Sequence, residues 1–466
     1  MAEQALDLSG SRRIHITNVG GAGMSAIATL LAEMGHRVSG HDPAADTPFL
    51  ERLREIGVAI STGSGAAALA DDVEAVVVST ATPRDHPHVL GAHKRSIPVV
   101  HRSTALAAIC ERRQVAAVAG THGKTTTSAL LTTVLTGAGT NPGWVVGASI
   151  AHLASNASWG GSGPLVVEAD ESDGTFLALG AWAATVTNVE PDHLEHWGSE
   201  AALHSAFEDF VAALEGPAVL CLDDPGSAAL ASSARRAITY GTTAGSDYLI
   251  ADVATKGTGV SFTLHHAGAA VSVAVASAPG VHNARNATAA LALAHQMGVP
   301  LEAGAAALAA FRGVARRFEV RGEAAGVVLV DSYDHLPTEV SAALAAARAG
   351  AWRRVVCCFQ PHRYSRTESL GHTFADAFVD ADVLVVTDVY PAGEPPRPGV
   401  TGKLVLDAVL DAHPWAHVAW MPRLDDVVDY LVGTLGPGDL CITLGAGDLT
   451  SVPDRVLERL GRRAST

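Results

Sequence analysis

A glycine-rich segment that contains a lysine and three threonines is the strongest sign of chemistry in this sequence. Gly120 and Gly123 stand between an apolar run and a helical pattern, and glycine allows a tight turn and close approach of a ligand. A helix that begins at such a loop directs free N–H groups toward an anion. Lys124 adds a positive charge and Thr125 a hydroxyl for a metal ion. This order predicts a site for a phosphate chain with magnesium.

The segment is a shortened form of the P-loop motif. A full motif would have a glycine five positions before Gly123, where Val118 stands. We expect Lys124 to span the β- and γ-phosphates and Thr125 to bind magnesium. A chance turn with glycine and lysine is the alternative. The residues expected to contact the nucleotide here are Gly120, Thr121, His122, Gly123, Lys124, Thr125 and Thr126.

Two acid-rich segments follow apolar runs in the same part of the chain. The first offers Glu168, Asp170, Glu171 and Asp173, and the second offers Glu190, Asp192, His193, Glu195 and His196. Magnesium prefers hard oxygen ligands, and a strand end beside a P-loop is where such an acid projects. Either segment taken alone also fits an ordinary solvated turn.

An earlier glycine-rich loop, "NVGGAGMSAIA", also lies between an apolar run and a helical pattern. It nearly matches the dinucleotide-binding motif, but Asn18 stands where the first glycine belongs. Gly20, Gly21 and Gly23 still allow a pyrophosphate to approach the backbone, and Asp42 lies where an acid would contact a ribose. A simple strand-to-helix turn is the alternative.

Two polar segments near the C-terminus also follow apolar runs. They are "VDSYDHLPTEV" and "FQPHRYSRTES", and the second places Arg363 and Arg366 three residues apart. The carboxyl ends of parallel strands are where open α/β sheets bind ligands, and arginine forks suit carboxylates and phosphates. A surface turn with salt bridges is the alternative.

The pattern of elements predicts parallel sheets that bring these loops to common edges. Short apolar runs alternate with helical patterns in three blocks, which gives an α/β chain of three domains: 1–110 Rossmann-like, 111–316 P-loop ATPase-like, and 317–466 Rossmann-like. Between residues 247 and 278 the runs alternate with period two, which predicts a small antiparallel sheet.

Composition limits the classes of partner. A net charge of −16 over 466 residues argues against general binding to nucleic acid or to an anionic membrane. The five cysteines are scattered without a CxxC pair, which indicates reduced thiols. The N-terminus shows no apolar core of a secretory signal, so we expect a cytoplasmic protein.

The motifs together resemble those of the Mur ligases of peptidoglycan synthesis, and most closely the alanine-adding branch. The resemblance spans nearly the whole chain and keeps the family's order. It rests on "GGAGMSAIA", "GTHGKTTT", "EADESDGTF", "NVEPDHLEHWGS", "GVHNARNATAA", "RRFE", "DSYDHLPTE" and "FQPHRYSRT".

The resemblance implies a reaction and a division of labour. The N-terminal domain would hold a UDP-sugar, the central domain ATP, and the C-terminal domain would close over both and help to bind the amino acid. ATP would activate the lactyl carboxylate of UDP-N-acetylmuramate as an acyl phosphate, which the amine of L-alanine would attack. ADP and phosphate would be released, and the protein would be a monomer or a homodimer.

The resemblance also implies roles for individual residues. Lys124, Glu168, His193 and Arg366 would be catalytic, with Thr125, Glu168 and His193 as ligands of two magnesium ions. The nucleotide would further contact His282, Asn283, Asn286, Arg317 and Asp331. The sugar nucleotide and amino acid would contact Gly20, Gly21, Gly23, Met24, Ser25, Asp42, Tyr333, His335, Arg363 and Arg366.

Four residues depart from the family pattern. Asn18 replaces a glycine, Asp334 replaces a small residue, Leu336 replaces a second histidine, and Ser64 stands where a histidine is common. These changes leave two alternatives open: a divergent ligase that adds another small amino acid such as glycine or serine, and a nucleotide-binding regulator without turnover.

Overall fold

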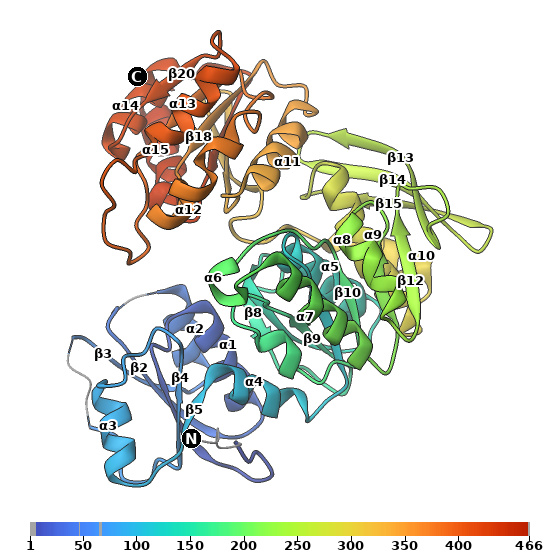
Figure 1. The fold of residues 1–466 in the computed structure, drawn as a ribbon, viewed down its shortest axis with the longest axis vertical. Helices are drawn as coiled ribbons and strands as arrows, with labels where there is room; N and C mark the ends of the chain where they lie inside the picture. Colours follow the sequence, from blue (N-terminus) through green and yellow to red (C-terminus); the bar gives the residue numbers. More distant parts are fainter. Residues whose placement is uncertain (1–5, 46, 65–67, 465–466) are drawn as a thin grey trace. The chain divides into compact units, whose positions relative to one another are not determined.

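The computed structural model describes residues 6–45, 47–64 and 68–464, and they form two compact units. The first unit consists mainly of the chain up to Ile250, with Leu264–Val271 and Arg285–Ala310. The second consists of Ala251–Thr263, Ser272–Ala284 and the chain from Phe311 onward. Figure 1 shows the α/β elements of both units in chain order, from blue to red.

The N-terminal part of the first unit is a five-stranded parallel sheet, as the alternating pattern predicts. The strand order is β3-β2-β1-β4-β5. The strands are β1 (Arg13–Thr17), β2 (Arg37–Asp42), β3 (Ala59–Thr62), β4 (Ala75–Val78) and β5 (Val99–His101). The helices are α1 (Ala22–Glu33), α2 (Pro48–Glu55), α3 (Pro87–Lys94) and α4 (Arg102–Cys110).

The second sheet has ten strands, in the order β15-β14-β13-β12-β11-β10-β6-β9-β7-β8. The strands are β6 (Val115–Ala119), β7 (Gly143–Ile150), β8 (Ser155–Ser158), β9 (Leu165–Glu168), β10 (Ala183–Val186), β11 (Ala218–Cys221), β12 (Ala237–Gly241), β13 (Tyr248–Lys256), β14 (Gly259–His266) and β15 (Ala269–Val275). The helices are α5 (Lys124–Gly137), α6 (Leu194–Trp197), α7 (Glu200–Ala213), α8 (Pro225–Ala229), α9 (Val281–Gln296) and α10 (Leu301–Ala307).

Two features of this sheet differ from the expectation. The period-two strands β13 to β15 continue the large sheet instead of forming a separate small one, because β12 pairs in parallel with the start of β13. The antiparallel pair β7 and β8 has no counterpart in the sequence-based prediction. The central strand β6 pairs in parallel with β10 and β9, so the segments that follow these three strands share one edge.

The C-terminal sheet lies in the second unit and has six strands, in the order β16-β17-β21-β18-β19-β20. Only β16 is antiparallel to its neighbour. The strands are β16 (Glu319–Ala324), β17 (Val327–Ser332), β18 (Arg354–Phe359), β19 (Val383–Val386), β20 (Val418–Trp420) and β21 (Asp439–Leu444). The helices are α11 (Pro337–Arg348), α12 (Tyr364–Leu370), α13 (Lys403–Ala412), α14 (Leu424–Thr434) and α15 (Val452–Ala464).

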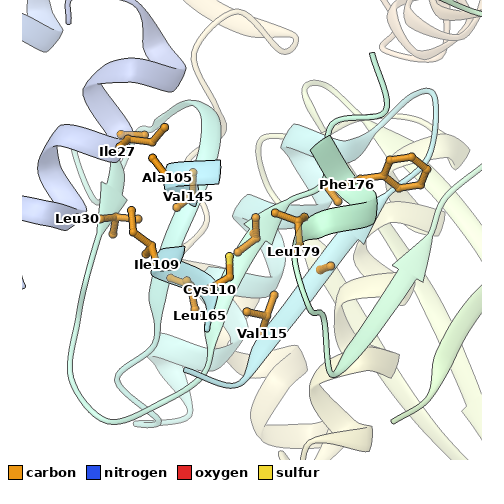
Figure 2. Close-up of a cluster of buried hydrophobic side chains, with 14 of the residues drawn as sticks. Ile27, Leu30, Ala105, Ile109, Cys110, Val115, Val145, Leu165, Phe176 and Leu179 are labelled. Carbon is orange, nitrogen blue, oxygen red and sulfur yellow. The ribbon is translucent and has the colours of Figure 1, made fainter. Parts of the chain in front are cut away.

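One hydrophobic core runs through both sheets of the first unit. Figure 2 shows Ile27 and Leu30 of α1 with Ile109 of α4, together with Val145 and Leu165 of the ten-stranded sheet. All five are buried. The N-terminal sheet and the P-loop sheet are therefore joined by packed side chains as well as by the chain.

All five cysteines are buried and free of disulfides, which agrees with the expected reduced thiols. Within the described ranges, the helices lack the combination of length and hydrophobicity that a membrane crossing requires.

Candidate active site

The P-loop follows β6 and ends at the start of α5. Gly120 has φ +126° and Gly123 has φ +79°, both in the region that favours glycine. A Cβ atom at Gly120 would lie 2.2 Å from the Thr187 hydroxyl, and one at Gly123 would lie 2.7 Å from Oδ1 of Asn286. The two glycines are therefore required both by conformation and by space. Gly123 is also the N-cap of α5 and has no side chain to occupy the first amides of the helix.

Lys124 lies folded over this loop. Its ammonium donates to the carbonyl oxygens of Gly120 and Thr121, at 2.7 and 3.0 Å, and to the Glu171 carboxylate at 2.7 Å. Burial opposes the charge of Lys124, but the carboxylates of Glu171 and Asp170 outweigh it and raise its pKa. Lys124 is therefore a permanent positive charge beside the expected phosphate position.

Thr125 and Glu168, two of the predicted metal ligands, are hydrogen-bonded to each other. The Thr125 hydroxyl donates to Oε1 of Glu168 at 2.8 Å, and Oε2 of Glu168 accepts from the backbone amide of Gly147. Both side chains supply the hard oxygen atoms that magnesium prefers. Among the described residues, no group of three or more His, Cys, Asp or Glu side chains is arranged to hold a metal ion.

The segment that follows β10 contacts the P-loop through Asn188 and Glu190. The backbone amide of His122 donates to Oδ1 of Asn188 at 2.8 Å, and the His122 ring lies 3.3 Å from the Glu190 carboxylate. Thr121 donates its hydroxyl to the Glu190 carbonyl oxygen. Sequence analysis did not nominate Asn188 as a site residue. Its position right after an apolar strand was the available signal.

His193 stays a predicted metal ligand. It has φ +52°, an uncommon conformation for histidine, and its Nε2 lies 3.4 Å from the Asp192 carboxylate. The left-handed backbone turns the chain sharply into α6, which His193 caps.

The four acids of the first acidic segment divide into two pairs that face different partners. Glu168 and Glu171 contact P-loop residues, as described above. Asp173 and Asp170 instead face Arg102, with oxygen-to-nitrogen distances of 2.6 and 3.6 Å. Arg102 belongs to α4 of the N-terminal domain. No local pattern in the sequence singles out this arginine.

The first glycine-rich loop has the expected shape despite Asn18. This residue has φ +52°, which asparagine adopts more readily than most residues, so the glycine-type turn is kept. The Asp42 carboxylate accepts from the amides of Gly20 and Ala44, at 2.8 and 2.9 Å. Asp42 therefore supports the loop, and its contact with a ribose stays a prediction. Of the other predicted loop residues, the structure buries Met24 and Ser25.

Four histidines that sequence analysis did not nominate gather in the N-terminal domain. Nε2 of His15 lies 3.0 Å from Nδ1 of His88, and the ring centroid of His88 lies 5.4 Å from that of His41 and 5.1 Å from that of His86. Burial, followed by the nearby histidines, lowers the pKa of His15 to about 3. His15 is therefore neutral in the folded protein at physiological pH.

In the second unit, Asp331 is the centre of a buried network at the end of β17. Its carboxylate accepts from the hydroxyls of Thr443 and Thr450, at 2.8 and 2.6 Å, and pairs with Arg316 at 3.3 Å. Arg316 and the predicted Arg317 both stack on the ring of Tyr333, at 4.9 and 5.1 Å. Arg316, which sequence analysis did not nominate, thus links Asp331, a predicted nucleotide contact, to Tyr333, a predicted substrate contact.

His335 and Arg366 are brought together by His362, which sequence analysis quoted but did not nominate. The rings of His335 and His362 are 5.5 Å apart, and Nη1 of Arg366 lies 3.2 Å from Nδ1 of His362. Burial and then the positive charge of these neighbours lower the pKa of His362 to about 3. Arg363 has φ +66° and begins α12.

The two unusual residues of this segment are both engaged locally. Oδ2 of Asp334 accepts from the Ser332 hydroxyl at 2.6 Å. Leu336 is buried, and its amide donates to the Glu339 carboxylate at 3.1 Å. In the structure, the Asp334 side chain is hydrogen-bonded within its own segment, and the Leu336 side chain is packed in the interior.

The start of α9 carries the predicted adenine segment. Nδ2 of Asn283 donates to the Pro279 carbonyl oxygen at 2.8 Å and lies 3.0 Å from Nε2 of His282. Asn286 lies against Gly123 of the P-loop. Contacts of His282 and Asn283 with a nucleotide stay predictions.

Comparison with known proteins agrees with this arrangement. Three family models match in succession: "Mur ligase family, catalytic domain" over residues 13–114, "Mur ligase middle domain" over 118–294, and "Mur ligase, glutamate ligase domain" over 316–447. The chain is 46% identical over 460 residues to UDP-N-acetylmuramate–L-alanine ligase of Kineococcus radiotolerans, covering 97% of each chain. The corresponding ligase of Geobacter sp. is 42% identical over 452 residues, covering 96% of this chain and 97% of that one.

A solved structure shares the fold along nearly the whole chain. UDP-N-acetylmuramate-alanine ligase MurC from Thermotoga maritima superimposes with a TM-score of 0.81 at 27% identity, covering 97% of this chain and all of that one. The murein peptide ligase of Psychrobacter arcticus, at 24% identity and a TM-score of 0.70, shows the same fold. With matches to all three domain models and relatives aligned from end to end, the chain belongs to the Mur ligase family.

Proposed function

We propose that the protein joins L-alanine to the lactyl carboxylate of UDP-N-acetylmuramate at the expense of ATP. The observation that carries this proposal is the pairing of Thr125 with Glu168, beside Lys124 in the P-loop, in a chain that matches the alanine-adding ligases over 97% of its length. The reaction consumes a cytoplasmic nucleotide, so we expect a cytoplasmic enzyme.

The main electrostatic difficulty of such a reaction is that a carboxylate must approach a triphosphate. Lys124 would move from Glu171 to the phosphates and neutralise part of their negative charge. Such electrostatic stabilisation is the main contribution to catalysis of phosphoryl transfer. The γ-phosphoryl group would pass to the lactyl carboxylate oxygen, with ADP as the leaving group. The amine of alanine would then attack the carbonyl carbon, and the C–O bond to phosphate would break as the amide forms.

The oxygen donors of the P-loop fit magnesium. Thr125 and Glu168 would hold a first ion, and His193 would contribute to a second. Bound magnesium supplies positive charge that offsets the repulsion between the two anions. The amine of alanine must lose a proton as it attacks, and His362, whose pKa is lowered to about 3, is too weak a base to accept it at neutral pH.

Phosphate release with a panel of amino acids tests the proposal. With UDP-N-acetylmuramate, ATP and magnesium, we expect rapid release that depends on L-alanine, and a product whose mass is that of the two substrates less water. Preference for glycine or serine would identify a divergent ligase. Binding of ATP without phosphate release for any amino acid would reject the ligase function.

A further inference from the structure

Arg102 connects the two predicted nucleotide sites of the first unit. It is the first residue of α4, and its Nη2 lies 2.6 Å from Oδ2 of Asp173. Asp173 belongs to the segment whose other acids, Glu168 and Glu171, contact Thr125 and Lys124 of the P-loop. A side chain of the N-terminal domain is therefore bonded to the acidic segment of the ATP site.

The other arm of the same guanidinium faces the first glycine-rich loop. A Cβ atom at Gly23 would lie 3.4 Å from Nη1 of Arg102, so the arginine is in van der Waals range of the loop at the start of α1. Gly23 is one of the glycines expected to admit a pyrophosphate. Arginine presents its donors as a rigid planar fork, so one arm can bind a phosphate while the other holds a carboxylate.

The shared core fixes the backbone from which Arg102 projects. Ile109 and Cys110 of α4 are buried in the cluster that also holds Val115 and Leu165 of the P-loop sheet. Because the core holds the backbone of α4 in place, the direction of the Arg102 side chain is set by the groups that it contacts, such as Asp173. Asp173 is itself fixed, because its Oδ1 accepts from the amide and hydroxyl of Thr175 at 3.1 and 2.5 Å.

We propose that Arg102 is a binding residue for the pyrophosphate of the sugar nucleotide, and that Asp173 is the positioning residue that aims it at the first loop. This inference rests on the proposed function, since it assumes a UDP-sugar at Gly20–Gly23. It goes further by making an acid of the ATP-site segment a determinant of sugar-nucleotide affinity. Asp173 itself touches no phosphate.

The competing interpretation is that the ion pair only docks the N-terminal domain against the P-loop domain. The two interpretations differ in what removal of the guanidinium changes. A docking pair would alter thermal stability but not affinity, whereas a phosphate contact must alter the affinity for UDP and its sugar derivatives.

Isothermal titration of the full chain with UDP, UDP-N-acetylmuramate and ADP separates them. We expect Arg102→Ala to raise the Kd of both uridine nucleotides by about 10- to 100-fold, as for loss of a charge-assisted hydrogen bond, and to leave the Kd of ADP within about twofold. Arg102→Lys keeps the charge without the fork, and we expect an intermediate Kd. Arg52→Ala is the matched control, since it removes an exposed arginine of the same domain, and it should change neither Kd.

Asp173→Asn tests the positioning role without removing volume. We expect it to raise the Kd of the uridine nucleotides by a smaller factor than Arg102→Ala, again with little change for ADP. In steady-state assays both variants should raise the KM for UDP-N-acetylmuramate and leave the KM for L-alanine unchanged. A wild-type Kd for UDP in Arg102→Ala or, if that variant does not fold, in Arg102→Lys would overturn the inference. Absence of any uridine nucleotide binding by the wild-type protein would instead reject the proposed function.

Discussion

The ammonium of Lys124 and the carboxylate of Glu171 form a buried ion pair at 2.7 Å, in which Glu171 is almost completely shielded from solvent. Because the same ammonium also donates to two P-loop carbonyl oxygens, it links the P-loop to the acidic segment after β9. Phosphates would therefore compete with Glu171 for Lys124. Glu171 keeps the lysine charged and in place until they do so.

Lys124→Ala should abolish phosphate release and should also destabilise the fold. The variant leaves the buried Glu171 without its partner, and loss of one member of a buried pair costs about 3–5 kcal/mol. Phosphate release and urea unfolding measure the two effects. The double variant Lys124→Ala/Glu171→Gln should recover much of the stability and none of the activity. Full stability of the single variant would show that the pair does not persist in solution.

Thr125→Val should weaken the binding of magnesium beside the P-loop. The variant keeps the volume of a buried side chain and removes the hydroxyl that contacts Glu168. We expect the magnesium concentration needed for half-maximal phosphate release to rise at least tenfold, about 1.4 kcal/mol. Thr125→Ser, which keeps the hydroxyl, is the control and should stay near the wild type. Equal magnesium curves for the two variants would argue against a metal contact at Thr125.

The free energy of unfolding should fall as the pH is lowered from about 6.5 toward 3, in part because of His15. Burial and the neighbours His88, His41 and His86 lower its pKa to about 3, against an ordinary value of 6.5. Within this window the unfolded chain binds a proton that the folded protein rejects, so the neutral form's contribution to stability is lost as the pH falls.

The contribution of His15 to this slope is at most about 1.4 kcal/mol per pH unit. His15→Gln, which cannot titrate, should flatten the curve of unfolding free energy against pH by up to that amount. His265→Gln, at an exposed strand position, is the control and should leave the slope unchanged. A curve for His15→Gln that runs parallel to that of the wild type would mean that His15 is protonated in the folded state.

Substitution of Asp334 should not change the choice of amino acid. Its carboxylate is occupied by the Ser332 hydroxyl, so Asp334→Asn should keep the same order of rates for alanine, serine and glycine. A reversed order in the phosphate-release panel would place Asp334 in the amino-acid pocket.

Leu336→Ala should act on stability instead of selectivity, because Leu336 is buried at the start of α11. We expect a loss of about 2–4 kcal/mol in the free energy of unfolding, as for other buried leucines. Urea unfolding measures the loss. A stable variant with altered selectivity would show that Leu336 contacts the amino acid.

The elements, and the loops after strands that carry glycines or acids, were predictable, while the partners within the site were not. The apolar runs before Gly120, Glu168 and Thr187 became adjacent parallel strands, so the edge that they share follows from periodicity alone. The division of the acidic segment between Lys124 and Arg102 could not be predicted, because it depends on which way each side chain turns after the strand ends.

Two other features depend on long-range packing that no local pattern encodes. The histidines around His15 come from two strands and from the start of α3, which the sequence separates by up to 73 residues. The sequence pattern of β13 to β15 predicts a separate antiparallel sheet. In the structure β13 instead pairs with the edge of β12, so these strands extend the large sheet.

The continuous core shown in Figure 2 has a consequence for dissection of the chain. A fragment cut after Cys110 would present Ile27, Leu30 and Ile109 to water, and the complementary fragment would present Val145 and Leu165. Each fragment expressed alone would expose an apolar patch and tend to aggregate. Coexpression of the two fragments would allow them to associate through these patches. Because the N-terminal domain shares its core with the P-loop domain, exchanging it between relatives would require transplanting the P-loop domain as well.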